Sequence, residues 1–214
     1  MIVCHLSYGC FTIVHLNNDP CSPIRVIIAN NRDEVIFRPT NDAAYWPNDL
    51  SYIYGGHDTV RNYSTWLSMN TKTGRVANLL FLAGQYAVSP ARPSGPLVAL
   101  YLHTNYSSMK TITYMNEFFT NGNEYNGINL LLIDYLENGY WKLYHSNNNE
   151  TDESNVILHS LVSGAFVISN NMFTRPFQKV LFGSKLFSDI LERYKNMFND
   201  YIEENIDPQP KWPR

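Results

Sequence analysis

The sequence is poor in charge, in cysteine and in long hydrophobic runs. Charged residues make up 16% of the 214 residues and the formal net charge is −3, so no basic field is available to hold a nucleic-acid backbone or an anionic membrane. No stretch approaches the roughly 18 consecutive apolar residues that a membrane-spanning helix needs. We therefore expect neither a nucleic-acid partner nor a transmembrane segment.

Cysteine is scarce and is confined to the N-terminal region, at Cys4, Cys10 and Cys21. The three follow no CxxC spacing, and an odd number leaves at least one thiol unpaired, which is typical of a reducing compartment. The first residues also lack the Lys or Arg with which a secretory signal begins. These features favour a cytoplasmic protein, and they give no indication of its oligomeric state.

No repeat or low-complexity block divides the chain. Its length suits one domain that buries its own core. We expect this single domain to cover residues 1–206. Residues 207–214, which include Pro208, Pro210 and Pro213, are predicted to form a disordered tail.

The most informative segment is Asn31-Arg32-Asp33-Glu34, which follows an apolar run at residues 26–29. A short apolar run closed by Asn and followed by Arg38-Pro39 is typical of a buried strand whose end presents polar side chains. A solvated turn between two strands is the alternative.

Local patterns predict groups of strands on either side of two helices. The strongest short signal is Asn138-Gly139, a hairpin turn between two apolar runs. Residues 40–64 are expected to be rich in loops. The predicted strands cover residues 1–14, 24–29, 64–69, 76–83, 128–135, 140–145, 156–159 and 164–169, and the predicted helices cover residues 97–102, 107–119 and 177–195. Segregated runs of strands and helices indicate an α+β fold in layers, not a doubly wound parallel sheet.

Several short motifs occur in a fixed order along the chain. They are Asn31-Arg32-Asp33-Glu34, Arg38-Pro39-Thr40, Trp46, Ser64-Thr65-Trp66-Leu67, Gly74-Arg75-Val76-Ala77, Gly95-Pro96-Leu97-Val98, Tyr125-Asn126-Gly127-Ile128-Asn129 and Ser169-Asn170. Together they resemble the NRDE family, also known as the transport and Golgi organisation 2 family. Each motif is weak alone, but their common order makes the resemblance specific.

The resemblance implies an N-terminal-nucleophile-hydrolase-like fold, a four-layer αββα sandwich. In such proteins the first residue of the mature chain is the nucleophile and its α-amine is the general base. Carried over by position, Cys4 would be the nucleophile, Arg32 the cation beside its sulfur and Asp33 the group that orients the amine. Asn170 would offer its amide to an oxyanion. The implied reaction is amide hydrolysis, and we expect Arg32 and Asp33 to face Cys4.

The chain departs from the family pattern at three places. Met1-Ile2-Val3 precedes Cys4 where the family has Met alone, Tyr63-Ser64 replaces a Gly-Gly pair, and Leu80-Phe81 replaces Thr-Asn. The first change leaves Cys4 without a free amine, and the third removes an amide. No family segment is recognisable after residues 177–195, so we also expect a sandwich truncated at its C-terminal end.

Each candidate residue has a structural alternative. Cys4 suits a small buried strand residue, and Arg32 with Asp33 could form a structural ion pair. Asn170 tolerates turn geometry. Trp46 and Trp66 suit either the core or a pocket wall. His5 and His57 match no ligand spacing, so no metal site is predicted.

These observations favour a non-catalytic member of the family that binds or transfers a hydrophobic small molecule. The ligand-binding residues would be Asn31, Arg32, Asp33, Trp46 and Trp66. The resemblance implies roles in secretory-pathway and Golgi organisation and in lipid, mitochondrial and haem homeostasis, with haem as one candidate ligand and no other cofactor. A cysteine-dependent amide hydrolase and a protein-interaction module are the alternatives.

Overall fold

The structure is a computed structural model. It describes residues 9–60, 64–84, 90–103, 110–120, 122–149, 151–152, 155–156 and 159–205. Cys4, His5 and residues 207–214 lie outside the described residues, so the roles predicted for them stay predictions.

The larger sheet has seven antiparallel strands in the order β11-β8-β7-β6-β5-β4-β3. Its strands are β3 (Thr40–Tyr45), β4 (Ile53–Asp58), β5 (Leu67–Asn70), β6 (Val76–Phe81), β7 (Ile128–Tyr135), β8 (Trp141–Asn147) and β11 (His159–Leu161). From β3 to β8, neighbouring strands follow one another in the chain. Most of this sheet is therefore built from local antiparallel connections.

A smaller sheet has the order β12-β1-β2 and joins segments far apart in sequence. Its members are β1 (Phe11–Leu16), β2 (Val26–Asn31) and β12 (Gly164–Ser169). β1 is the central strand, antiparallel to both neighbours. A separate two-stranded pair consists of β9 (Thr151–Asp152) and β10 (Asn155–Val156).

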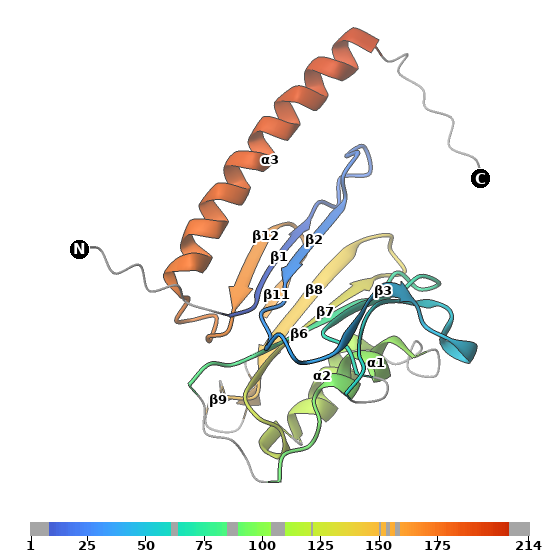
Figure 1. Cartoon of the computed structure of the whole chain (residues 1–214). Helices are drawn as coiled ribbons and strands as arrows, with labels where there is room; N and C mark the ends of the chain where they lie inside the picture. The colour runs from blue at the N-terminus through green and yellow to red at the C-terminus, as the bar shows by residue number, and fades with distance from the viewer. Residues whose placement is uncertain are drawn as a thin grey trace.

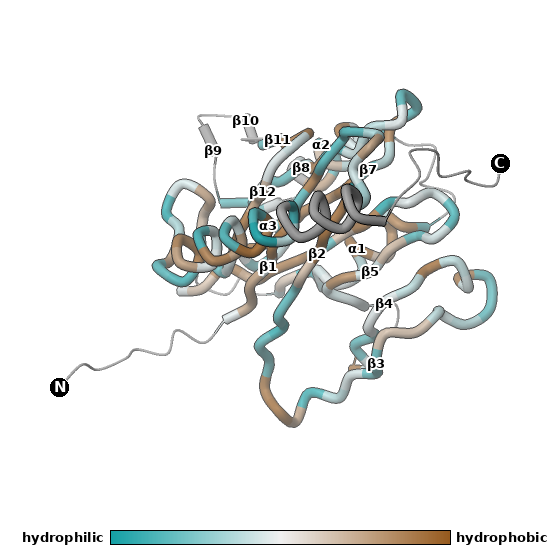
Figure 2. Tube along the Cα trace, turned by 90° about the horizontal axis from the view of Figure 1, so that it is seen from above, coloured by the Kyte–Doolittle hydropathy of each residue, from teal (hydrophilic) through white to brown (hydrophobic). Residues whose placement is uncertain are grey.

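Helices cover the outer faces of the two sheets. The helices are α1 (Gly95–Leu102), α2 (Thr111–Thr120) and α3 (Gln178–Asn205), with short 3-10 turns η1 (Asn48–Leu50) and η3 (Gly122–Glu124). Figure 1 shows the layers in the order α3, small sheet, large sheet, then α1 and α2. Seen from above, α3 crosses over β12, β1 and β2 (Figure 2). Within the described residues, no helix combines the length and apolar character needed to cross a membrane.

Strand β7 shows how the sequence fills two cores at once. Ile128, Leu130 and Leu132 belong to the core shared with α1 and α2. The alternate residues Leu131 and Ile133 belong to the core between the two sheets. Because successive strand residues point to opposite faces, a strand buried on both sides reads as a continuous apolar run. The apolar sequence of β7 is therefore explained by its central position.

The predicted α+β class is confirmed, as are both predicted hairpins. β5 pairs with β6, and β7 pairs with β8 around Asn138-Gly139. The third predicted helix is present as α3, which begins at Gln178 and extends to Asn205. The second is present as α2 from Thr111 onward.

The prediction of loop for residues 40–64 is wrong, because this region contains β3 and β4. β3 is exposed along its whole length, so its sequence shows no apolar alternation. β4 contains Gly55-Gly56, which normally signals a turn. In the sheet, a Cβ at Gly56 would lie 2.6 Å from the Trp66 ring, so the glycine makes room for Trp66 against the strand.

His145 is a fully buried polar residue on β8. Its Nε2 lies 3.0 Å from Oδ1 of Asn129 on the neighbouring strand β7. Burial, together with repulsion from His159, lowers the pKa of His145 to about 3. The imidazole is therefore neutral in the folded protein at physiological pH.

This buried imidazole predicts a stability loss in acid. The unfolded chain takes up a proton on His145 near pH 6.5 and the folded protein does so only near pH 3, so stability falls as the pH drops through this window. The slope for one such group is at most about 1.4 kcal/mol per pH unit. Urea unfolding at several pH values should show a shallower slope for His145→Gln than for the parent chain.

His15 is the matched control, because partial burial also lowers its pKa although it is less enclosed. His15→Gln should leave most of the acid dependence in place. Equal slopes for the parent chain and His145→Gln would contradict the assignment of this effect to His145.

Candidate functional site

The pairing of β1 determines which residues meet at the end of the small sheet. Phe11 is opposite Asn31 on β2 and opposite Ser169 on β12. Cys10 precedes Phe11, and both pairings are antiparallel. Cys10 therefore lies between Arg32, which follows Asn31, and Asn170, which follows Ser169. Two of the residues that the family resemblance selects thus flank Cys10.

The thiol of Cys10 is part of a small polar cluster. Its Sγ donates to the backbone oxygen of Asp33 over 3.7 Å, and its own carbonyl accepts a 2.6 Å hydrogen bond from the Ser169 hydroxyl. Lys179 of α3 donates from Nζ to the Gly9 carbonyl at 3.0 Å. Burial lowers the pKa of Lys179, while Cys10 and Asp33 act in the opposite direction. A lysine ammonium is thus within electrostatic reach of this thiol.

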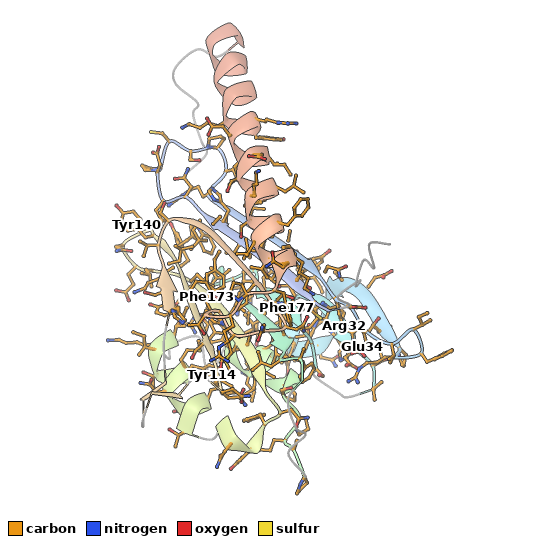
Figure 3. The ribbon with its side chains drawn as sticks, turned by 90° about the vertical axis from the view of Figure 1, so that its left-hand side faces the viewer. Arg32, Glu34, Tyr114, Tyr140, Phe173 and Phe177 are labelled. Atoms are coloured by element: carbon orange, nitrogen blue, oxygen red, sulfur yellow. The ribbon has the colours of Figure 1, made fainter. Side chains whose placement is uncertain are left out.

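Arg32 is held by acidic and aromatic neighbours. Its Nη2 lies 3.2 Å from a carboxylate oxygen of Glu34 and 3.8 Å from one of Asp58. Its guanidinium stands 4.3 Å from the centre of the Trp66 ring, a cation–π distance. Figure 3 shows Arg32 and Glu34 side by side. Its charged partners in the described structure are thus Glu34 and Asp58, and not the predicted Asp33.

Asp58 connects the Asn31–Glu34 segment to the large sheet. It is almost fully buried on β4 and accepts hydrogen bonds from Nε of Arg38 at 2.7 Å and from the backbone N–H of Val60 at 3.0 Å. Buried carboxylates need such partners. The Arg38 and Asp58 pair therefore anchors the loop that carries Arg32.

These groups border a cavity of about 280 Å³, here called the Cys10 pocket. Its lining includes Arg32, Asp33 and Glu34, together with Cys10 and Trp66, which contact them. Asn31 itself ends β2 and is exposed. Trp46 lies elsewhere: it is buried in the core near α1, and its ring packs 5.1 Å from that of His57.

Asn170 is engaged in holding strand ends together. Its Nδ2 donates to the Phe81 carbonyl at 2.6 Å, and its backbone oxygen accepts from the Ala83 N–H at 2.7 Å. Both bonds connect the end of β12 to the end of β6. One of its two amide hydrogens is thus committed to the Phe81 carbonyl, and Phe81 also lines the Cys10 pocket.

Cys10, Asp58 and Lys179 were not proposed as site residues from the sequence.

A second cavity lies beside β12 and under the first turns of α3, and is here called the α3 cavity. Its volume is about 450 Å³, within the usual range for small-molecule sites. Most of its wall is apolar. Lining residues include Leu143, Phe166, Phe173, Phe177, Val180 and Leu181, with His145 and His159 as the imidazoles. Figure 3 shows Phe173 and Phe177 together at the base of α3.

The sequence contained part of the signal for the α3 cavity. Phe173 lies shortly before the predicted helix and Phe177 is its first residue, which indicates an apolar entry to α3. The imidazoles come from β8 and β11, which pair with each other at His145 and His159. The pairing of β8 with β11 could not be predicted from the sequence separation of His145 and His159.

Among the described residues, no cluster of three or more His, Cys, Asp or Glu side chains could hold a metal ion.

Comparison with known proteins identifies relatives of this chain. The family model for Transport and Golgi organisation 2 matches residues 10–208, so the match begins at Cys10. The Transport and Golgi organization protein 2 homolog of Bos taurus is 31% identical over 180 residues, which cover 83% of this chain and 62% of the relative. The Homo sapiens homolog is 30% identical with the same coverage.

The Drosophila melanogaster protein, Transport and Golgi organization protein 2, is 31% identical over 114 residues, or 51% of this chain and 40% of that protein. This chain spans about three-fifths of the length of the two mammalian relatives. The family match covers nearly the whole chain and confirms the resemblance drawn from the motifs. This chain therefore belongs to the Transport and Golgi organisation 2 family.

Proposed function

We propose that this chain is a non-catalytic family member that binds a hydrophobic small molecule in the α3 cavity. The observation that carries the proposal is the apolar wall of that cavity, built from β8, β12 and α3. Burial of an apolar ligand there is favoured by about 25 cal/mol per Å² of apolar surface removed from water. The family name supports a transport-related or Golgi-related role, with the ligand as cargo or regulator.

The order of the layers supports a fold of the N-terminal-nucleophile-hydrolase type, but two features of the Cys10 pocket favour a non-catalytic role. The nitrogen of Cys10 is part of the Gly9–Cys10 peptide bond, and an amide nitrogen is not a base. The amide of Asn170 already donates to the Phe81 carbonyl. The ion pairs of Arg32 further suggest that this pocket serves to fix the loop.

Haem fits the α3 cavity only in part. Imidazole side chains, which can ligate haem iron, are present at His145 and His159. Among the described residues, the lining contains no Arg or Lys to pair with the two haem propionates. An uncharged apolar ligand therefore suits this lining better than haem.

Ser184 provides a direct test, because it lines the α3 cavity from the helix. N-phenyl-1-naphthylamine, whose fluorescence rises in apolar sites, should bind the full chain at micromolar concentration. Ser184→Trp fills the cavity and should weaken binding at least about tenfold, which corresponds to about 1.4 kcal/mol. Lys185→Trp, at the next and exposed position, should bind like the parent chain. Binding that is equal in all three proteins would place the probe elsewhere and contradict the proposal.

Haem is tested separately by titration followed through its absorption band. A spectral shift at micromolar haem that Ser184→Trp abolishes would identify haem as a ligand of the α3 cavity. Absence of a shift, with the naphthylamine still bound, would restrict the ligand class to uncharged apolar molecules.

A second candidate function, cysteine-dependent amide hydrolysis, is favoured by the position of Cys10 between Arg32 and Asn170 with Lys179 nearby. It requires a mature chain that begins with a cysteine, so that the α-amine is free. Intact-mass analysis of the purified protein should show residues before Cys4 and Cys10 retained. A mass that corresponds to a chain starting at Cys4 or Cys10 would contradict the non-catalytic proposal and support the hydrolase.

A further inference from the structure

The orientation of the Asn129 amide is fixed by its surroundings. Its Nδ2 lies 3.0 Å from the backbone oxygen of Ser169 and 3.0 Å from that of Asn171. Carbonyl oxygens only accept hydrogen bonds, so both contacts require the amide NH₂ group. The oxygen Oδ1 must therefore be the atom that faces Nε2 of His145 at 3.0 Å.

This orientation determines the tautomer of His145. Because the Asn129 oxygen can only accept, Nε2 of His145 carries the hydrogen. The ring is fully buried, and this burial keeps it neutral, so Nδ1 has no hydrogen and presents a lone pair. Within the part of the chain that the structure describes, Nδ1 has no hydrogen-bond partner. A buried acceptor without a donor is unfavourable and calls for an explanation.

The surroundings of His145 are aromatic. Its ring is stacked on that of His159 with 5.6 Å between centroids, and the Phe166 ring lies 5.2 Å away. Phe173, at 6.1 Å, completes this side of the α3 cavity. Two of the polar lining groups are already engaged: the Ser169 hydroxyl donates to the Cys10 carbonyl, and Oδ1 of Asn171 accepts from the Met172 N–H.

We infer that the ligand of the α3 cavity is an apolar molecule with one hydroxyl or N–H group, which donates a hydrogen bond to Nδ1 of His145. This inference rests on the proposed function, because it specifies the ligand of the same cavity. The apolar body would contact Phe166, Phe173 and Phe177, and the donor would supply the partner that Nδ1 lacks. In the described part of the chain, Nδ1 is already buried without a partner, so the aromatic rings that cover it must shift to admit the donor. An ether or a hydrocarbon of the same shape would leave this acceptor unpaired.

A matched pair of probes tests the inference on the unmodified chain. 2-Naphthol carries a hydroxyl donor, and 2-methoxynaphthalene has the same ring system with an ether that only accepts. We expect 2-naphthol to bind about 5- to 150-fold more tightly, because only its hydroxyl relieves the cost of the unpaired acceptor, which corresponds to that ratio in affinity. Ser184→Trp should weaken both probes, which places the binding in the α3 cavity.

His145→Phe keeps an aromatic ring and removes the lone pair, so the preference for 2-naphthol should fall to about onefold. This variant also leaves Asn129 without its donor and could fail to fold. Nitrogen-15 NMR of the histidine rings in the parent chain is therefore the second measurement. The Nδ1 resonance of His145 should show the unprotonated form and should shift when 2-naphthol, but not 2-methoxynaphthalene, is added.

The outcomes separate the two claims. Equal affinity of the two probes, with both weakened by Ser184→Trp, would overturn the inference and leave the proposed function standing. Binding of neither probe would contradict the proposed function itself. A protonated Nδ1 in the NMR spectrum would also overturn the inference, because the lone pair would not exist.

Discussion

The double pairing of β1 is the constraint on which both sites of this protein depend. Because β1 lies between β2 and β12, it brings the Asn31–Glu34 segment and the Ser169-Asn170 strand end to the same edge of the small sheet. The residues that follow β12 then lead into α3, whose Lys179 returns to the carbonyl of Gly9. The Cys10 pocket is thus assembled from three distant parts of the chain.

The same arrangement creates the α3 cavity on the other side of β12. Asn129 uses its amide to hold the backbone at Ser169 and Asn171, and its oxygen to fix the ring of His145. One side chain therefore joins the large sheet to the end of β12 and sets the hydrogen-bonding character of the cavity. The charges gather at the Cys10 pocket and the apolar surface at the α3 cavity, so the two sites suit different chemistry.

Sequence reasoning predicted the features that depend on local patterns. The Asn138-Gly139 hairpin, the α+β class and the family follow from turn chemistry, from the order of elements and from ordered motifs. β3 escaped prediction because it is exposed, and β4 because Gly55-Gly56 imitates a turn. Lys179 and Asp58 could not be assigned to the Cys10 pocket, since tertiary pairing alone brings them there. Cys4 was selected for its place near Met1, whereas strand register places Cys10 beside Arg32.

The most direct test of this account is a disulfide trap across the β1 and β12 pair. The test uses a chain in which Cys4 and Cys21 are replaced by Ser, so that Cys10 is the remaining cysteine. In this chain, Asn170→Cys should form a disulfide with Cys10 under mild oxidation. Residues opposite each other on antiparallel strands lie within the Cα separation that a disulfide spans. Asn171→Cys, one residue further along, is the matched control and should react far less. Peptide mapping that shows a Cys10 to residue 170 crosslink would support the register, whereas no crosslink at 170, or an equal one at 171, would contradict it.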